Sequence, residues 1–313
     1  MMERRTENKI VVVVRRTRLD DLIARFNTEE QARFYVEHSG ADFSDYQTED
    51  QVYKKAVRDA EDLLSHHGRV QVVDRAFVPN FIFGPMDTVV TIGQDGLVAN
   101  VLKYLDGQLL IGVNPDAKRW EGVLLPFTLA DLDLVVPEVF ARKRPIVEVT
   151  MAEARLNNGQ SLTAVNDLFV GPRTHSSARY SIRIGEKVED HSSSGIIVST
   201  GLGSTGWLRS ILAGAMGVAS SFSGQFLKIN ERNAFQWNAD YLYFSVREPW
   251  PSKTTGATIT FGKITQWQPL ILESHMPENG VIFSDGIESD FLEFHSGTEA
   301  TIAIAGKKGH LVT

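Results

Sequence analysis

The sequence predicts an α/β domain with a parallel sheet over residues 1–140 and a β-rich domain over residues 141–313. In the first part, apolar runs of strand length alternate with segments whose apolar residues recur at helical spacing. This order builds a parallel sheet through right-handed crossovers. From Pro145 onward, short alternating runs are separated by turn residues, which is typical of antiparallel β structure. The C-terminal end of the chain is a candidate to pack back on the first domain.

The first domain opens on a continuous β-branched run at residues 10–14, as expected for a strand buried on both faces. Thr48-Glu49-Asp50-Gln51 has the capping-box pattern that starts a helix, and apolar residues follow at helical spacing as far as His66-His67-Gly68. The remaining elements expected here are strands at 70–73, 88–92 and 109–113, and a helix at 97–105.

The second domain is expected to contain one clear helix, at residues 204–216. The stretch Ser220-Ser221-Phe222-Ser223-Gly224 is mostly small and polar, so it is expected to be a loop. The strands expected here are at 146–150, 164–170, 180–184, 196–199, 241–246, 258–261, 270–273, 280–284 and 301–305.

Composition excludes several classes of protein. The 313 residues include no cysteine, which excludes a disulfide scaffold, a thiolate zinc site and a cysteine nucleophile. The net charge of -7 argues against a nucleic-acid partner. No apolar run approaches the ~20 residues of a membrane helix, and the N-terminus lacks a signal-peptide pattern. The eight scattered histidines suggest no metal ligands. We therefore expect a cytoplasmic protein without a membrane or nucleic-acid partner and without direct protein ligands to a metal.

The first motif that carries chemistry is Gly93-Gln94-Asp95-Gly96, directly after a predicted strand and before a predicted helix. Glycines let the backbone approach a ligand, and a helix N-terminus attracts anions, so the loop suits a phosphate group. A carboxylate in such a loop suits the handling of a proton or a metal beside the phosphate. The alternative is a plain turn in which Asp95 caps the helix.

The second motif is Asn166-Asp167, which interrupts an otherwise apolar strand. Asn and Asp are disfavoured in strands, and together they can hydrogen-bond the vicinal hydroxyls of a ribose. The alternative is a β-bulge or an edge position.

The third motif is Gly201-Leu202-Gly203-Ser204-Thr205-Gly206, which has the Gly-x-Gly-x-x-Gly spacing of the Rossmann dinucleotide fingerprint. An acid, Glu231, follows a weak strand at 226–229, as that interpretation requires. The β-rich sequence on both sides of this motif argues against the Rossmann interpretation, because the fingerprint usually opens a βαβαβ unit. The hydroxyls of Ser199, Thr200, Ser204 and Thr205 suggest hydrogen bonds to a ligand. The alternative is a tight turn with Ser204 as helix N-cap.

The order and spacing of these motifs, with Ile111-Gly112-Val113-Asn114 between the first two, resemble the NAD kinase family over roughly residues 70–220. The family pattern runs Gly-Gly-Asp-Gly-Thr, a Gly-Ile-Asn strand end, Asn-Glu or Asn-Asp, and Ser-Thr-x-x-Gly-Ser-Thr-Ala-Tyr. The stretch 112–122 and Ser193-Ser194-Gly195 look most like the mitochondrial-type branch.

This resemblance implies the NAD kinase and diacylglycerol kinase-like fold, and phosphoryl transfer from ATP or another donor to the adenosine ribose 2′-hydroxyl of NAD, giving NADP. It implies Asp95 as general base, Mg²⁺ bound with ATP, NAD as substrate, and a homodimer or homotetramer. The residues implied to bind the phosphate donor are Gly93, Gln94 and Gly96. Those implied to bind NAD are Asn114, Asn166, Asp167, Thr200, Ser204, Thr205, Gly206, Trp207 and Ser210. Asp285 is implied to lie near the site of phosphate transfer.

Three residues depart from the family pattern: Gln94 replaces the second loop glycine, Leu97 replaces the following threonine, and Ser194 replaces an aspartate. Three alternatives remain open, of which the departures at Gln94 and Leu97 motivate the sensor named below. One is a related kinase of the same fold that acts on a sugar or lipid alcohol. Another is a catalytically weak NAD(P) sensor, and the last is a Rossmann oxidoreductase that uses Glu231.

Overall fold

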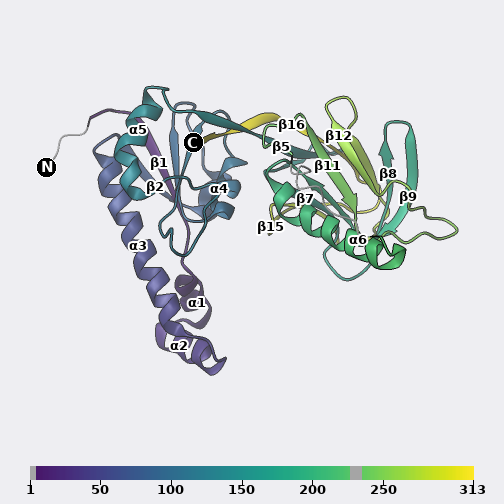
Figure 1. The fold of residues 1–313 in the computed structure, drawn as a ribbon, viewed down its shortest axis with the longest axis horizontal. Coiled ribbons are helices and arrows are strands. Elements are labelled where there is room, and N and C mark those ends of the chain that lie inside the picture. Colours follow the sequence, from purple (N-terminus) through teal and green to yellow (C-terminus); the bar gives the residue numbers. More distant parts are fainter. Residues whose placement is uncertain (1–4, 226–234) are drawn as a thin grey trace. The chain divides into compact units, whose positions relative to one another are not determined.

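The computed structural model describes residues 5–225 and 235–313, which form two compact units (Figure 1). The first unit runs to Val147 and includes His310–Thr313, while the second comprises Glu148–Gly309. The segment 226–229 and Glu231 lie outside the described residues.

The first unit contains a parallel sheet, as predicted. Its strand order is β2 (Arg69–Asp74), β1 (Lys9–Val14), β3 (Thr88–Ile92) and β4 (Leu109–Val113), and the end of β16 (Glu299–Val312) pairs parallel with β4. Residues 10–13 of β1 are wholly buried, because the β-branched run packs on both faces.

Helices cover this sheet. Side chains of α3 (Phe43–Ser65) and α5 (Leu132–Phe140) share one apolar core with β1, β3 and β4. The helix α4 (Asp95–Leu102) contacts β3 and β4, and Figure 1 shows it on the other side of the strands from α3 and α5. Short 3₁₀ turns lie at Arg75–Asn80 and Leu129–Asp131.

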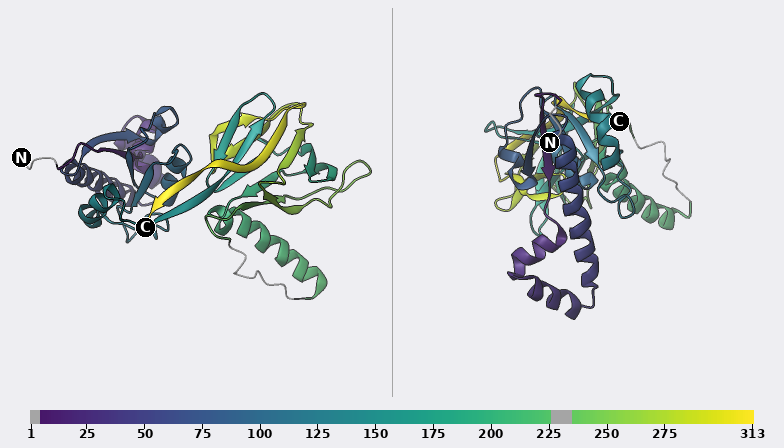
Figure 2. Two further views of the ribbon diagram at one scale, coloured as in Figure 1. Left: turned by 90° about the horizontal axis from the view of Figure 1, so that it is seen from above. Right: turned by 90° about the vertical axis from the view of Figure 1, so that its left-hand side faces the viewer.

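The predicted start of α3 is wrong, because the helix begins at Phe43 with Asp42 as its N-cap. Phe43 packs with residues of α1 (Arg18–Phe26) and α2 (Glu29–His38) in a small separate core. Figure 2 shows α1 and α2 beside the end of α3 that extends away from the strands. The capping-box residues Thr48 and Glu49 therefore lie inside the helix, where Glu49 is buried.

The second unit holds antiparallel sheets, which confirms the predicted β-rich domain. One sheet has the order β12-β11-β10-β7-β14-β15. In the other, β16, β13, β8 and β9 are neighbours in that order, and β5 pairs with β16 and β6. Apolar side chains of both sheets form one core. The bounds are β5 (Ile146–Leu156), β6 (Ser161–Ala164), β7 (Asp167–Pro172), β8 (Ala178–Ile184), β9 (Lys187–Ser193), β10 (Ile196–Ser199), β11 (Tyr241–Val246), β12 (Phe261–Thr265), β13 (Leu270–Ser274), β14 (Gly280–Ser284) and β15 (Ile287–Glu293).

Three predicted elements of this unit are wrong in detail. The expected strand at 164–170 is broken, because β6 ends at Ala164 and β7 begins at Asp167. The expected strand at 258–261 begins only at Phe261. The expected loop at 220–224 is mostly helical, because α6 (Trp207–Ser223) continues to Ser223 and is capped by Gly224 in the left-handed region, φ 68°. Within the described ranges, no helix is long and apolar enough to cross a membrane.

Candidate functional site

The carboxyl ends of β1, β3 and β4 meet at one edge of the parallel sheet, where open α/β sheets bind their ligands. The loop Gly93–Gly96 follows β3, and Asn114 follows β4. Arg15 follows β1, a position that the sequence analysis did not single out. The topology therefore brings the predicted phosphate loop, an amide and a cation to the same edge.

The predicted phosphate loop lies at the start of α4. Gln94 is the N-cap residue in an extended conformation (φ -123°), and its side chain makes no capping hydrogen bond. Gly96 is exposed, and a Cβ there would meet nothing within 4 Å. Because the first N–H groups of a helix have no partner within the helix, this turn presents open backbone donors to an anion.

Asp95 is the first residue of α4, and Gln94 is the N-cap, so the expected alternative role of Asp95 as N-cap is wrong. Its Oδ1 accepts a hydrogen bond of 2.7 Å from the backbone N–H of Leu124. The carboxylate is therefore anchored through one oxygen to the segment that follows β4.

That segment is organised by Asn114. The Asn114 amide donates to the Trp120 carbonyl at 2.9 Å, and its Oδ1 accepts from the Asp116 N–H at 3.1 Å. Gly122 has φ 66°, and a Cβ on it would lie 2.6 Å from the Asn114 Nδ2. Asn114, implied to bind NAD, thus uses its amide to shape the loop that orients Asp95.

Arg15 places a cation beside the glycine turn. Its Nη2 pairs with the buried Glu49 carboxylate at 2.7 Å, and its guanidinium lies 4.7 Å from the centre of the Tyr53 ring. The Nε of Arg15 is buried without a partner, and a Cβ on Gly93 would lie 3.8 Å from it. This unpaired donor suits a phosphate oxygen. The only sequence signal was the Arg15-Arg16 pair at the end of a buried strand.

Tyr53 joins the ends of two of these strands. Its hydroxyl donates to the Ile92 carbonyl at 2.9 Å and accepts from the Arg15 N–H at 2.9 Å. Burial raises the pKa of Tyr53 to about 12, so the hydroxyl remains a donor at neutral pH and holds this edge together.

In the second unit, Asn166 and Asp167 lie at the break between β6 and β7. The Asp285 carboxylate accepts from the backbone N–H groups of Val165, Asn166 and Asp167 at 3.1, 2.6 and 3.3 Å. The strand β7 lies between β10 and β14, so the edge-position alternative is wrong. Asp285 therefore fixes the backbone at the break between β6 and β7, which carries the side chains of Asn166 and Asp167.

Neither side chain is fully paired at this break. No hydrogen bond joins the Asn166 amide to another side chain or backbone group in the described ranges, and the Asp167 Oδ1 is buried without a partner. Burial raises the pKa of Asp167 to about 7, although a Ser199 hydrogen bond lowers it, and the Asp285 charge raises it further. The pair thus offers hydrogen-bonding groups to a polar ligand.

The raised pKa of Asp167 predicts a stability change with pH. Between about pH 4 and 7 the unfolded chain ionises this group while the folded chain keeps it protonated, so stability falls as pH rises through that window. We expect Asp167→Asn to stabilise the fold at pH 8 by about 2–4 kcal/mol and to have little effect at pH 4. Thermal unfolding at both pH values checks this, and an equal difference at both would contradict it.

The glycine-rich turn is packed tightly against that break. A Cβ on Gly203 would lie 2.2 Å from the Asn166 carbonyl, and one on Gly201 would lie 2.0 Å from the Gln236 carbonyl, so neither position accepts a side chain. Thr200 donates its N–H to the Asn166 carbonyl at 2.9 Å. The Asn166-Asp167 break and the glycine-rich turn therefore pack together as one local structure.

The hydroxyls of this turn divide into two groups. Those of Thr200 and Ser204 are buried and donate to backbone carbonyls, at 2.5 Å to Val165 and 2.7 Å to Gly201. Thr205 and Ser210 are exposed. Ser204 is not the N-cap of α6, because Gly206 is. The buried hydroxyls fix the turn. The exposed Thr205 hydroxyl is open to a ligand, while the exposed Ser210 hydroxyl also donates to the Gly206 carbonyl at 3.4 Å.

Trp207 begins α6 on an aromatic platform. Its ring is stacked on Phe169, with centroids 5.9 Å apart and planes 6° apart, and Phe169 also stacks on Phe283 at 4.8 Å. The Arg247 guanidinium lies 5.7 Å from the Trp207 ring. The indole is half-buried, so one part of it is available to a ligand.

Comparison with known proteins gives matches in structure only: no family model matches the sequence, and no curated protein does. An NAD kinase from Archaeoglobus fulgidus, solved in complex with ATP, is similar with a TM-score of 0.57 and 14% identity, over 97% of this chain and 93% of that one. The yeast NADH kinase complexed with NADH is similar with a TM-score of 0.59 and 12% identity, over 98% of this chain and 84% of that one. The chain therefore has the two-domain fold of the NAD kinases, with an α/β N-terminal and a β-rich C-terminal domain.

Proposed function

We propose that this protein transfers the γ-phosphoryl group of ATP to the adenosine ribose 2′-hydroxyl of NAD or NADH. The observation that carries the proposal is the open turn Gly93–Gly96 with an anchored carboxylate in it and an unpaired arginine donor beside it. The likeness to two kinases solved with ATP and with NADH supports it.

On the donor side, the backbone N–H of Gly96 and the Arg15 Nε are assigned to the ATP phosphates. The Gly93 N–H already donates to the Val113 carbonyl at 3.2 Å. Asp95 is assigned as the general base through the carboxylate oxygen that does not accept from Leu124. The 2′-oxygen forms a bond to the γ-phosphorus, the bond from that phosphorus to the bridging oxygen of ADP breaks, and the hydroxyl proton passes to Asp95.

Mg²⁺ fits this donor set as an ion bound with the nucleotide. Nowhere in residues 5–225 or 235–313 do three or more carboxylates or histidines gather into a metal site, whereas a single carboxylate beside phosphates suits Mg²⁺. When bound with the nucleotide, the ion would neutralise part of the phosphate charge. On the acceptor side, Asn166 and Asp167 are assigned to the ribose, and Trp207 with Thr205 and Ser210 to the rest of the dinucleotide.

The assay is NADP(H) formation by the purified chain with ATP, Mg²⁺ and either NAD or NADH. We expect turnover with at least one of the two acceptors. Saturable dinucleotide binding without turnover would instead favour the sensor, and turnover of ATP with a sugar or lipid alcohol but not with NAD would favour the related kinase.

Gln94→Gly tests the departure from the family pattern. The extended φ of Gln94 is open to any residue, so the backbone does not require glycine there. We expect the variant to raise kcat/KM for ATP several-fold, because it removes a side chain beside the phosphates, and to change stability by about 1 kcal/mol or less. Steady-state kinetics with varied ATP checks this, and a fall in kcat/KM would instead indicate that the amide binds phosphate.

A further inference from the structure

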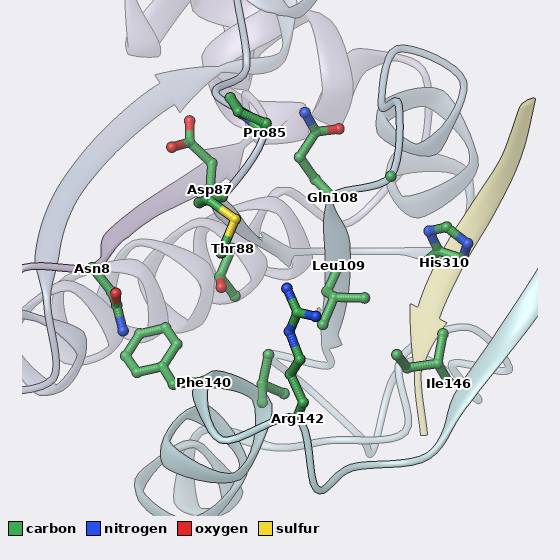
Figure 3. A pocket seen from close by; sticks show the side chains of 13 residues that line it. Asn8, Pro85, Asp87, Thr88, Gln108, Leu109, Phe140, Arg142, Ile146 and His310 are labelled. Atoms are coloured by element: carbon green, nitrogen blue, oxygen red, sulfur yellow. The ribbon is translucent and has the colours of Figure 1, made fainter.

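A cavity of about 330 Å³ lies at the amino-terminal edge of the parallel sheet in the first unit (Figure 3). Asn8 precedes β1, Thr88 begins β3, and Leu109 begins β4. The glycine turn and Asn114 follow the opposite ends of the same strands, so this cavity is separate from the phosphate loop. Its volume lies at the lower end of the range for small-molecule pockets.

One part of the cavity wall is apolar and open. Met86, Leu109, Val139, Phe140 and Ile146 contribute to it. The side chains of Met86 and Ile146 are 74% and 43% exposed, respectively. Covering these surfaces would be favourable by the hydrophobic effect, so the wall suits the apolar body of a ligand.

Arg142 brings a cation into this cavity from a strained backbone position. The Lys143 N–H donates to the Glu138 carbonyl at 2.9 Å, and the Arg142 N–H donates to the Val139 carbonyl at 3.0 Å. These two bonds make a Schellman motif at the end of α5, in which glycine usually occupies the left-handed position. Arg142 takes that position here with φ 54°. Glycine would hold this turn with less strain than arginine does.

The guanidinium of Arg142 has no ion pair or hydrogen bond with any group in the two described ranges. Figure 3 shows its side chain directed into the cavity beside Leu109. His310 also lines the cavity, and its Nδ1 is buried without a partner. An unpaired cation beside an apolar wall is the arrangement that binds an anion with an apolar body.

Asp87, the acidic residue that lines the cavity, does not neutralise Arg142. Asp87 pairs with Lys9 at 3.1 Å and accepts from the Gly84 N–H at 2.9 Å. Figure 3 shows its carboxylate pointing away from Arg142. The Gln108 amide is also engaged, because it accepts from the Asp106 N–H and donates to the Gly84 carbonyl.

We propose that this cavity binds a small amphiphilic anion, a molecule with one carboxylate or phosphate head and an apolar body, with the head on Arg142. The apolar body lies along Met86, Phe140 and Ile146. This binding site is independent of the phosphoryl-transfer function proposed above.

Calorimetric titration of the full chain with octanoate, octyl phosphate and octan-1-ol tests the proposal. We expect at least one of the two anions to bind saturably, about tenfold or more tighter than the alcohol, because a hydrogen bond to a charged group contributes that much. The tighter anion identifies the head group. Failure of both anions to saturate would overturn the proposal.

Three variants locate the binding. Arg142→Gly removes the cation and relieves the left-handed backbone, so its melting temperature should match or exceed that of the parent, and its affinity for the anion should fall about tenfold or more. Arg142→Lys should retain most of the affinity. Lys143→Gln removes a neighbouring exposed charge and should bind like the parent. Unchanged anion binding by Arg142→Gly would also overturn the proposal.

Discussion

Asp95→Asn is expected to lower kcat for NADP(H) formation by roughly 10²–10⁴-fold, the usual contribution of a general base. The amide retains a carbonyl oxygen that can accept the Leu124 N–H, so the segment that follows β4 keeps its place. What the variant lacks is a basic oxygen for the proton of the ribose hydroxyl. Because Asn166 and Asp167 are unchanged, the dinucleotide should bind with its original affinity.

Initial rates at saturating ATP, together with the dissociation constant for NAD, separate these two effects. Asp106→Asn is the matched control, because it makes the same chemical change at an exposed residue before β4 and should keep kcat within about twofold. Melting temperatures of both variants show whether the fold is kept. An Asp95→Asn protein that turns over at the parent rate would remove Asp95 from the mechanism.

The strands of the parallel sheet in the first unit could be predicted because their signals are local, whereas α1, α2 and α5 were not predicted. Residues 10–14 form a buried β-branched run, which describes a central parallel strand without reference to the rest of the chain. The turn at Gly93–Gly96 was placed correctly for the same reason, since the strand before it and the helix after it are each encoded nearby.

The errors arise where distant residues decide the outcome. The start of α3 at Phe43 depends on packing against α1 and α2, so the local capping box at Thr48 was misleading. The break before β7 depends on Asp285, which is 119 residues from Asn166 in the sequence. The continuation of α6 to Ser223 had one local signal, Gly224, which ends the helix in the left-handed region.

The same distinction applies to the candidate site. The types of residue at the phosphate loop were visible in sequence, but their partners were not. Glu49 holds Arg15 from a position 34 residues away, and Leu124 anchors Asp95 from 29 residues away. Sequence patterns indicate which groups are present, while the long-range pairing decides which of them remain free for a ligand. Asn114 illustrates this, because its amide is used inside the chain.

Asp285→Ala is expected to lower the free energy of unfolding of the second unit by about 3–5 kcal/mol. The variant leaves three backbone N–H groups without their acceptor beside a central strand, and each buried unpaired donor costs about 1–3 kcal/mol before the chain relaxes. Asp285 also has φ 55°, where alanine is strained by about 1–2 kcal/mol. Since the break holds Asn166 and Asp167 in place, dinucleotide binding should weaken as well.

Two further variants separate these causes. Asp285→Gly removes the left-handed strain but still lacks the acceptor, so it should recover only about 1–2 kcal/mol relative to alanine. Asp285→Asn keeps one oxygen and tolerates the backbone angle, so it should be the least destabilised of the three. Urea unfolding followed by tryptophan fluorescence suits the comparison, because Trp120 is the only one of the five tryptophans outside residues 148–309. If glycine instead restored the full stability of the parent, backbone strain rather than the lost hydrogen bonds to the carboxylate would account for the loss. Asp285 would then have no part in holding the break.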